Sequence, residues 1–197
     1  MYLEFYFKPE RGGVNMRAQA KIKPELPMDF VRTYHFIGIF VILFIAGPLH
    51  FAYEWAGENY FVGLFAPVSE SIWEHLKMVY WPTLLWWLVG YAVFRNSKNL
   101  NVMRWFQSMA VSIIFGMLII VIWYYLWSGA FGIEASWVNF SSMVSVVIGQ
   151  LLAIHVYRVA EPRWIYLIPG VLFVIGLALM SGYFTYNPPS LPIFIAP

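Results

Sequence analysis

Five long apolar runs govern what this chain can fold into. A transmembrane helix needs about 20 largely apolar residues, and each run reaches that length. Hydrophobic residues make up 61% of the 197 residues and charged residues only 11%, whereas charged residues make up about 25% of a soluble protein. We therefore predict an all-α integral membrane protein with five transmembrane helices. The helices are expected near residues 34–54, 70–94, 102–127, 137–159 and 163–186.

The basic residues gather at alternate ends of these runs and so predict the orientation. Six of them precede the first helix, and others flank the loops near residues 95–104 and 158–163. The other two loops and the chain end contain none, and Lys77 is the one exception. Because Lys and Arg are retained on the cytoplasmic side of short loops, we predict the N-terminus inside and the C-terminus outside. This divides the chain into a cytoplasmic segment (1–33), a five-helix transmembrane domain (34–186) and an external tail (187–197).

The chain lacks cysteine and lacks nucleotide- and nucleic-acid-binding motifs, and this excludes several classes of function. The chain contains no cysteine, which excludes disulfides, thiolate metal ligands, covalent c-type haem attachment and cysteine nucleophiles. No phosphate-binding glycine loop or nucleic-acid-binding signature occurs, and the membrane topology already accounts for the basic residues. We expect membrane lipids as partners, together with a membrane-protein partner or a second copy of the chain, and no nucleic acid.

The stretch PVSESIWEHLK, residues 67–77, places four ionisable side chains at the predicted outer end of the second helix. On a regular helix, Glu70, Glu74 and Lys77 share one stripe. His75 points about 100° away from Glu74. An unpaired ionisable group inside a span costs roughly 2.5–3.5 kcal/mol, so such groups normally face one another or a cavity. The stretch therefore needs a polar partner.

The end of the first helix, GPLHFAYEW, supplies such a partner. His50 and Glu54 are four residues apart and therefore lie on one face of that helix. A short loop joins the first two helices, so they run antiparallel and bring their polar groups to a similar depth. We predict an outward-facing polar site formed by His50, Glu54, Glu70, Glu74 and His75.

A purely structural explanation competes for part of this cluster. Ser71 followed by Glu74 fits a capping box, in which both side chains satisfy free N–H groups at a helix start. Glu74 and Lys77 also have the spacing of an ordinary ion pair, and we predict that Lys77 pairs with Glu74 or Glu70. Interfacial solvation accounts for the exposed carboxylates one by one, but it explains His50 and His75 less well.

The run ESIWEHLK, with LHFAYEWAG before it and WPTLLWW after it, resembles an uncharacterised family of small bacterial multi-helix membrane proteins, a domain of unknown function. The motif of that family has the form Asn-Glu-Ser-x-Trp-Glu-His-Leu-Lys, and the resemblance covers residues 35–90. Ser69 stands where the motif has Asn. The resemblance implies a bacterial inner (cytoplasmic) membrane protein with a site at this position, and it implies no particular reaction.

Two imidazoles and several carboxylates form a plausible ligand set for a divalent metal, Zn, Mn or Fe. We predict His50, Glu54, Glu74 and His75 as metal ligands, with Glu70 or Glu74 as a general base. Metal-dependent hydrolysis of a lipid-like or small substrate is then the leading hypothesis. The alternative is a non-enzymatic protein that binds an ion or ligand, or that serves as a subunit in the assembly of a membrane complex.

Haem ligation is a further alternative, because the four histidines fall into two pairs by depth. His35 and His155 lie toward the inside, and His50 and His75 toward the outside. Histidines on different helices can ligate a haem from both faces. Against this, His35 sits beside the interface and His155 can simply bond a neighbouring helix.

Overall fold

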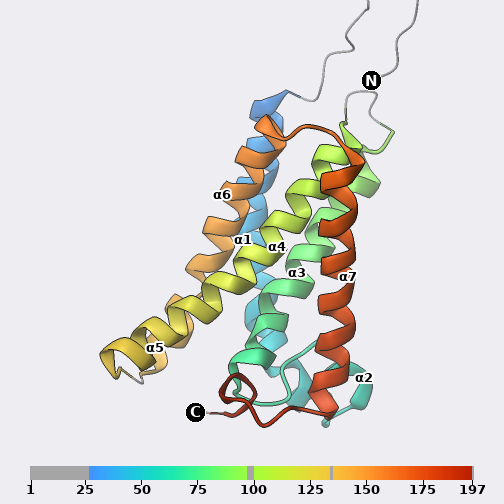
Figure 1. The fold of residues 1–197 in the computed structure, drawn as a ribbon. Coiled ribbons are helices and arrows are strands. Elements are labelled where there is room, and N and C mark those ends of the chain that lie inside the picture. The colour runs from blue at the N-terminus through green and yellow to red at the C-terminus, as the bar shows by residue number, and fades with distance from the viewer. Residues whose placement is uncertain (1–26, 97–99, 134, 197) are drawn as a thin grey trace, which may run out of the picture.

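The computed structural model describes residues 27–96, 100–133 and 135–196, and within these ranges the chain forms a bundle of long helices (Figure 1). The long helices are α1 (Met28–Trp55), α3 (Ile72–Phe94), α4 (Val102–Tyr125), α6 (Val144–Val159) and α7 (Trp164–Tyr186). The short elements are α2 (Tyr60–Gly63), the π-helical turn η1 (Leu126–Ala130), α5 (Ser136–Ser141) and the 3-10 turn η2 (Pro192–Phe194).

Each of the five predicted segments is helical, and the described residues include no strand. α1 begins at Met28, six residues before the expected start. α4 continues directly into η1, so the helical segment that begins at Val102 extends to Ala130. The fourth predicted helix is divided into α5 and α6 by a turn at residues 142–143. Residues 1–26 of the predicted cytoplasmic segment lie outside the described residues.

Four helical segments are long and apolar enough to cross a membrane, at residues 28–55, 102–130, 137–159 and 164–186. α3 does not reach the same apolar character, so length and composition support four candidate spans, whereas five were predicted from the sequence. The difference has a physical cause: α3 contains Glu74, His75 and Lys77 together with several Trp and Tyr residues. It also contacts α1, α4 and α7, and eleven of its residues are buried, so its polar groups meet protein.

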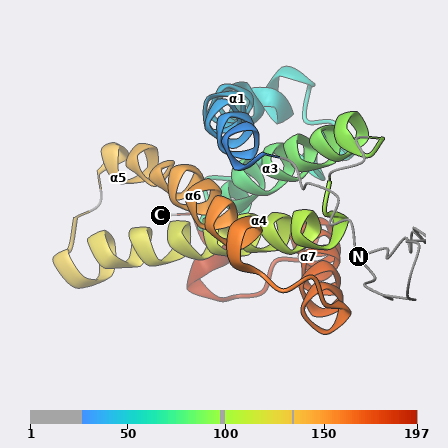
Figure 2. The same ribbon diagram turned by 90° about the horizontal axis from the view of Figure 1, so that it is seen from above.

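α4 lies at the centre of the bundle, in contact with α3, α6 and α7 (Figure 2). Its contact with α6 depends on small residues, because a Cβ at Gly149 would lie only 2.8 Å from the carbonyl oxygen of Ser112. Ser145, one turn earlier on α6, is fully buried. Small side chains allow two helix backbones to approach closely inside a membrane.

Aromatic contacts fix α1 against α3. The ring of Tyr34 stacks on Trp86 with centroids 4.3 Å apart, and its hydroxyl donates a hydrogen bond of 2.8 Å to the Trp86 carbonyl. Gly38 has no side chain and so leaves room for the Trp86 indole. The two helices that carry the predicted site are therefore held in a fixed register.

The bundle has two chemically different ends. The basic end carries Arg32, Arg95, Arg104, Arg158 and Arg163 at the starts and ends of helices. The loop end consists of residues 55–71, which join α1 to α3, and of the tail 187–196. α1 ends there at Trp55, and the chain turns away through Gly57 and Glu58, whose φ angles are 64° and 59°. Phe194 of the tail packs on Trp73 with ring centroids 4.8 Å apart, so the described part of the predicted external tail folds against α3.

Candidate metal site

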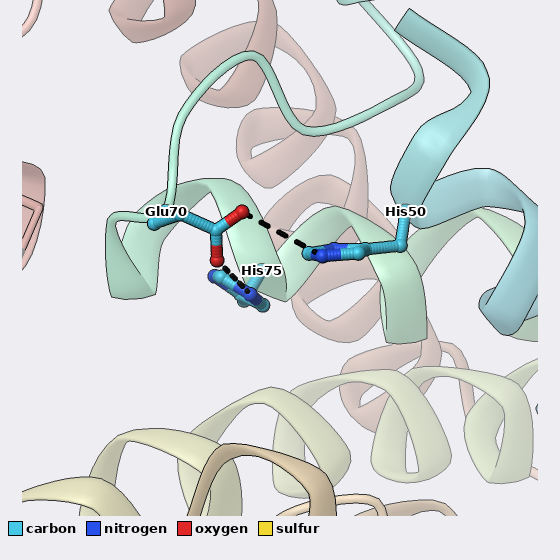
Figure 3. A group of neighbouring side chains, drawn as sticks. All are labelled: His50, Glu70 and His75. Carbon is cyan, nitrogen blue, oxygen red and sulfur yellow. Dashed lines mark ion pairs between the residues drawn. The ribbon is translucent and has the colours of Figure 1, made fainter. Parts of the chain in front are cut away.

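Three of the predicted site residues converge at the loop end: His50 near the end of α1, Glu70 in the loop, and His75 in the first turn of α3 (Figure 3). Nε2 of His50 lies 3.6 Å from Oε1 of Glu70, and Nε2 of His75 lies 3.4 Å from Oε2 of Glu70. One ligand atom from each residue falls within 4.8 Å of the other two. Among the described residues, this is the group of three or more His, Asp or Glu side chains with the geometry to hold a metal ion.

These distances are informative about the kind of contact. An N–H···O hydrogen bond spans about 2.7–3.2 Å, and both nitrogen–oxygen separations exceed that range. Donor atoms around a tetrahedral ion with bonds of about 2.1 Å are about 3.4 Å apart. The two imidazole nitrogens face different oxygens of the Glu70 carboxylate, and the three side chains converge without forming good hydrogen bonds with one another. A bound ion would draw one donor atom of each residue closer together than the 4.8 Å within which they lie.

The imidazole of His75 is oriented by the protein backbone. Its Nδ1 lies 2.9 Å from the carbonyl oxygen of Ser71, and only a protonated Nδ1 can donate to that oxygen. In the neutral ring this leaves the lone pair on Nε2, the nitrogen that faces Glu70. A metal-ligating histidine typically donates its other N–H to a carbonyl or carboxylate in this way, so His75 is preset as a ligand.

Glu70 reaches the two histidines because it lies outside the helix. The N-cap of α3 is Ser71, whose Oγ accepts a hydrogen bond of 3.3 Å from the backbone N–H of Glu74. Glu70 precedes the cap, in the non-helical loop, and its side chain is 63% exposed. The side chains of His50 and His75 are 24% and 12% exposed, so the site opens to solvent on the side of Glu70 and is closed on the side of His75.

Glu74 and Lys77 form a separate buried ion pair. Nζ of Lys77 lies 2.6 Å from Oε2 of Glu74, which confirms the pairing predicted for Lys77. The ammonium also donates to the carbonyl oxygens of Gly63, at 2.7 Å, and Ala66, at 3.2 Å. The remaining contacts of Glu74 are with the backbone N–H of Val68 at 3.0 Å and the hydroxyl of Thr185 at 3.2 Å.

The ion pair therefore binds the loop and α7 to α3. Only half of the predicted capping box forms. Ser71 caps the N–H of Glu74 as expected, but the carboxylate of Glu74 bonds to Val68 and not to the N–H of Ser71. The sequence contains no sign of the contacts to the Gly63 and Ala66 carbonyls, because any residue supplies a backbone carbonyl.

The predicted five-residue site is thus only partly assembled. The structure brings together His50, Glu70 and His75. Glu74 is held by Lys77, and Glu54 is exposed in the last turn of α1, outside the group that converges. The geometry consequently gives Glu70, which the sequence analysis considered as a base, the position of a ligand.

The histidines do not provide the geometry of a haem site. The rings of His50 and His75 have centroids 5.3 Å apart, which leaves no room for a porphyrin between them. His35 is fully buried and stacks on Trp87 with centroids 4.1 Å apart, while His155 is exposed on α6.

Comparison with known proteins finds one matching family. A model of a protein family of unknown function, DUF6512, matches residues 27–196. No curated protein and no solved structure matches the chain. The match covers every described helix and all three residues of the site, and it agrees with the resemblance to an uncharacterised family that the motif around residues 70–77 carries.

Proposed function

Since the chain belongs to DUF6512, a family of unknown function, we propose its function from the site. The protein is an integral membrane metalloprotein that holds a divalent ion at His50, Glu70 and His75. The observation that carries the proposal is the convergence of two imidazoles and a carboxylate, with one ligand atom of each within 4.8 Å of the other two, at separations too long for hydrogen bonds. Two imidazoles and one carboxylate make Zn²⁺ the first candidate, with Mn²⁺ and Fe²⁺ as the others.

We further propose that all five long helices cross the membrane. α3 contains 23 residues and, at 1.5 Å per residue, is about 35 Å long, sufficient for a hydrocarbon core of about 30 Å. Hydropathy underrates α3 because its polar side chains are paired inside the bundle: Lys77 and Glu74 are 1% and 3% exposed. A helix enclosed by neighbours does not need an apolar surface all round.

The orientation and location follow from the charges. The arginines of the basic end belong on the cytoplasmic side, which puts the N-terminus inside and the C-terminus outside. The His50–Glu70–His75 site then faces outward, at the external surface of a bacterial inner membrane. An ion from the external medium reaches it on the exposed side of Glu70.

Hydrolysis is the reaction that this ligand set favours. Three protein ligands leave at least one coordination position for water or substrate, as in the His₂Glu sites of zinc hydrolases. A site about one turn inside the helix ends lies near the lipid headgroups, so a lipid headgroup or another small interfacial molecule is the expected substrate class.

Metal binding without hydrolysis, for ion delivery or for assembly of a membrane complex, is the competing function. One observation favours it: neither carboxylate considered as a base is free for that role. Glu70 occupies a ligand position, and Glu74 is neutralised by Lys77 in a buried pair. A hydrolase at this site would need its base from a water ligand or from the substrate itself.

Metal analysis of the purified protein tests the proposal. We expect about one equivalent of zinc to survive dialysis of the wild-type protein, and much less in His50→Ala and His75→Ala variants. His155→Ala, at an exposed histidine on α6, is the matched control and should retain the metal. Equal metal content in all four proteins, or none in the wild type, would reject the site. Release of headgroup from phospholipid by the zinc-loaded protein would then decide between hydrolysis and binding alone.

A further inference from the structure

A groove at the basic end of the bundle has the properties of a lipid-binding site. It lies between α4, α6 and α7 and has a volume of about 380 Å³. Its walls are largely apolar and include Ala110, Val111, Ile114, Phe115, Val156 and Gly170. Phe115 is 43% exposed, so the groove opens on the outer surface of the bundle, where an acyl chain of the surrounding lipid can enter.

Polar contacts shape the end of this groove. Gln107 of α4 donates hydrogen bonds of 3.1 and 3.2 Å to the carbonyl oxygens of Glu161 and Arg163. Nε of Arg104, also on α4, donates a hydrogen bond of 2.9 Å to the carbonyl oxygen of Ala160. The connection from α6 to α7 is therefore fastened along α4, a course visible in Figure 2. These contacts hold the groove open as a preformed feature.

The charge at this end suits an anionic headgroup. Arg104 and Arg163 both contact residues that line the groove, through Ala160 and Glu161. The pair between Arg163 and Glu161 is 2.9 Å long, but the two side chains are 65% and 60% exposed. Because an exposed ion pair contributes little, Arg163 can turn to a phosphate at small cost. α7 begins here without a side-chain cap, and the positive end of its dipole adds to the attraction.

We propose that this groove binds one anionic phospholipid, with an acyl chain between α6 and α7 and the phosphate at Arg104 and Arg163. Basic pockets between transmembrane helices on the cytoplasmic side are suited to anionic headgroups. The apolar groove alone accommodates a chain of any phospholipid, and the two arginines select the anionic one. The inference is independent of the metal site, which lies at the opposite end of the helices.

Lipid-binding measurements on the full chain in detergent test the inference. Native mass spectrometry would compare phosphatidylglycerol with phosphatidylcholine of identical acyl chains. We expect tighter binding of phosphatidylglycerol, and a weakening of about fivefold for each arginine removed, since each basic residue near a lipid surface contributes about 1 kcal/mol. Arg163→Gln is at an exposed position and should fold normally. Arg104→Gln tests the second arginine and should weaken phosphatidylglycerol binding by a similar factor in a folded variant.

Two further variants separate the headgroup contact from the groove. Val111→Trp fills the groove and should weaken both lipids, whereas Leu118→Trp, on an exposed face of α4, should weaken neither. Arg32→Gln is the charge control, because Arg32 belongs to the basic end but lies on α1, on the other side of the bundle from α7 (Figure 2). Equal affinity for the two lipids, or an equal loss in Arg32→Gln and Arg163→Gln, would overturn the proposal.

Discussion

The ammonium nitrogen of Lys77 lies 2.6 Å from a carboxylate oxygen of Glu74, and both side chains are buried. Removing one partner leaves the other charge unpaired in the protein interior, which typically costs about 3–5 kcal/mol. We therefore expect Lys77→Met to lower the free energy of unfolding by this amount. Chemical denaturation in detergent, followed by tryptophan fluorescence, measures the change.

An exposed pair of the same spacing serves as the control. Arg32 and Asp29 lie 3.4 Å apart with side chains 46% and 94% exposed, and an exposed pair contributes about 0–1 kcal/mol. Arg32→Met should therefore leave the free energy of unfolding nearly unchanged. Similar effects of the two substitutions would show that Lys77 is not a buried structural charge.

Substitutions of the three carboxylates distinguish the ligand set in the structure from the one expected from the sequence. Glu70→Gln should reduce zinc affinity at least tenfold, since even indirect partners of a metal site contribute 10–100-fold. Glu54→Gln, at an exposed position outside the group, should have no effect. Glu74→Gln should reduce stability more than affinity. Isothermal titration with zinc measures these affinities, and the opposite ranking of Glu54 and Glu70 would restore the first ligand set.

Acidification should release the metal. Both imidazoles must be neutral to donate a lone pair to the ion, so protons compete with it. We expect zinc affinity to fall as the pH is lowered from weakly alkaline to weakly acidic values. With two histidines the loss approaches about a hundredfold per pH unit once both are protonated. A pH-independent affinity would point to carboxylates as the only ligands.

The predicted orientation can be read with single cysteines, because the chain contains none of its own. Asn59→Cys lies in the loop end and Asn96→Cys follows the last turn of α3. A membrane-impermeant thiol reagent added from outside the cell should label the first and not the second. Labelling of the second alone would invert the topology and place the metal site in the cytoplasm.

The α4–α6 contact gives a test of packing. Gly149→Val would place side-chain atoms against the Ser112 carbonyl and should destabilise the bundle by about 1–3 kcal/mol. Gly176 on α7 has nothing within 4 Å of its missing Cβ, so Gly176→Val should cost far less. Thermal unfolding of both variants in the same detergent provides the comparison. Equal melting temperatures of the two variants would show that α4 and α6 do not pack closely at Gly149.

The long helices were predictable because apolar length is a property of local sequence. The five helical segments and the pairing of Lys77 both follow from spacing along the chain. The number of helices that length and composition identify as membrane spans was harder to predict from the sequence. α3 is shielded by α1, α4 and α7, and the surroundings of a helix are set by segments far away in the sequence.

Which carboxylate belongs to the site depends on the residue at which α3 begins. If Glu70 belonged to the helix, it would share a stripe with Glu74 and lie away from His75. Because Ser71 is the N-cap, Glu70 is free of helical geometry, and it folds back toward His75, five residues later. Helix boundaries are uncertain from sequence by a few residues, and one residue decides which carboxylate joins the two histidines.

The hydrogen bond between Thr185 and Glu74 spans 111 residues of sequence and has a consequence for the order in which the protein matures. Chains are synthesised and fold from the N-terminus, so α3 is made long before α7. Until α7 is made, the carboxylate of Glu74 lacks its hydroxyl partner and the first turns of α3 lack their contacts with α7. The loop end is therefore completed only after α7 has been made, and a chain that stops before α7 leaves the Glu74–Lys77 pair uncovered on the side that α7 occupies.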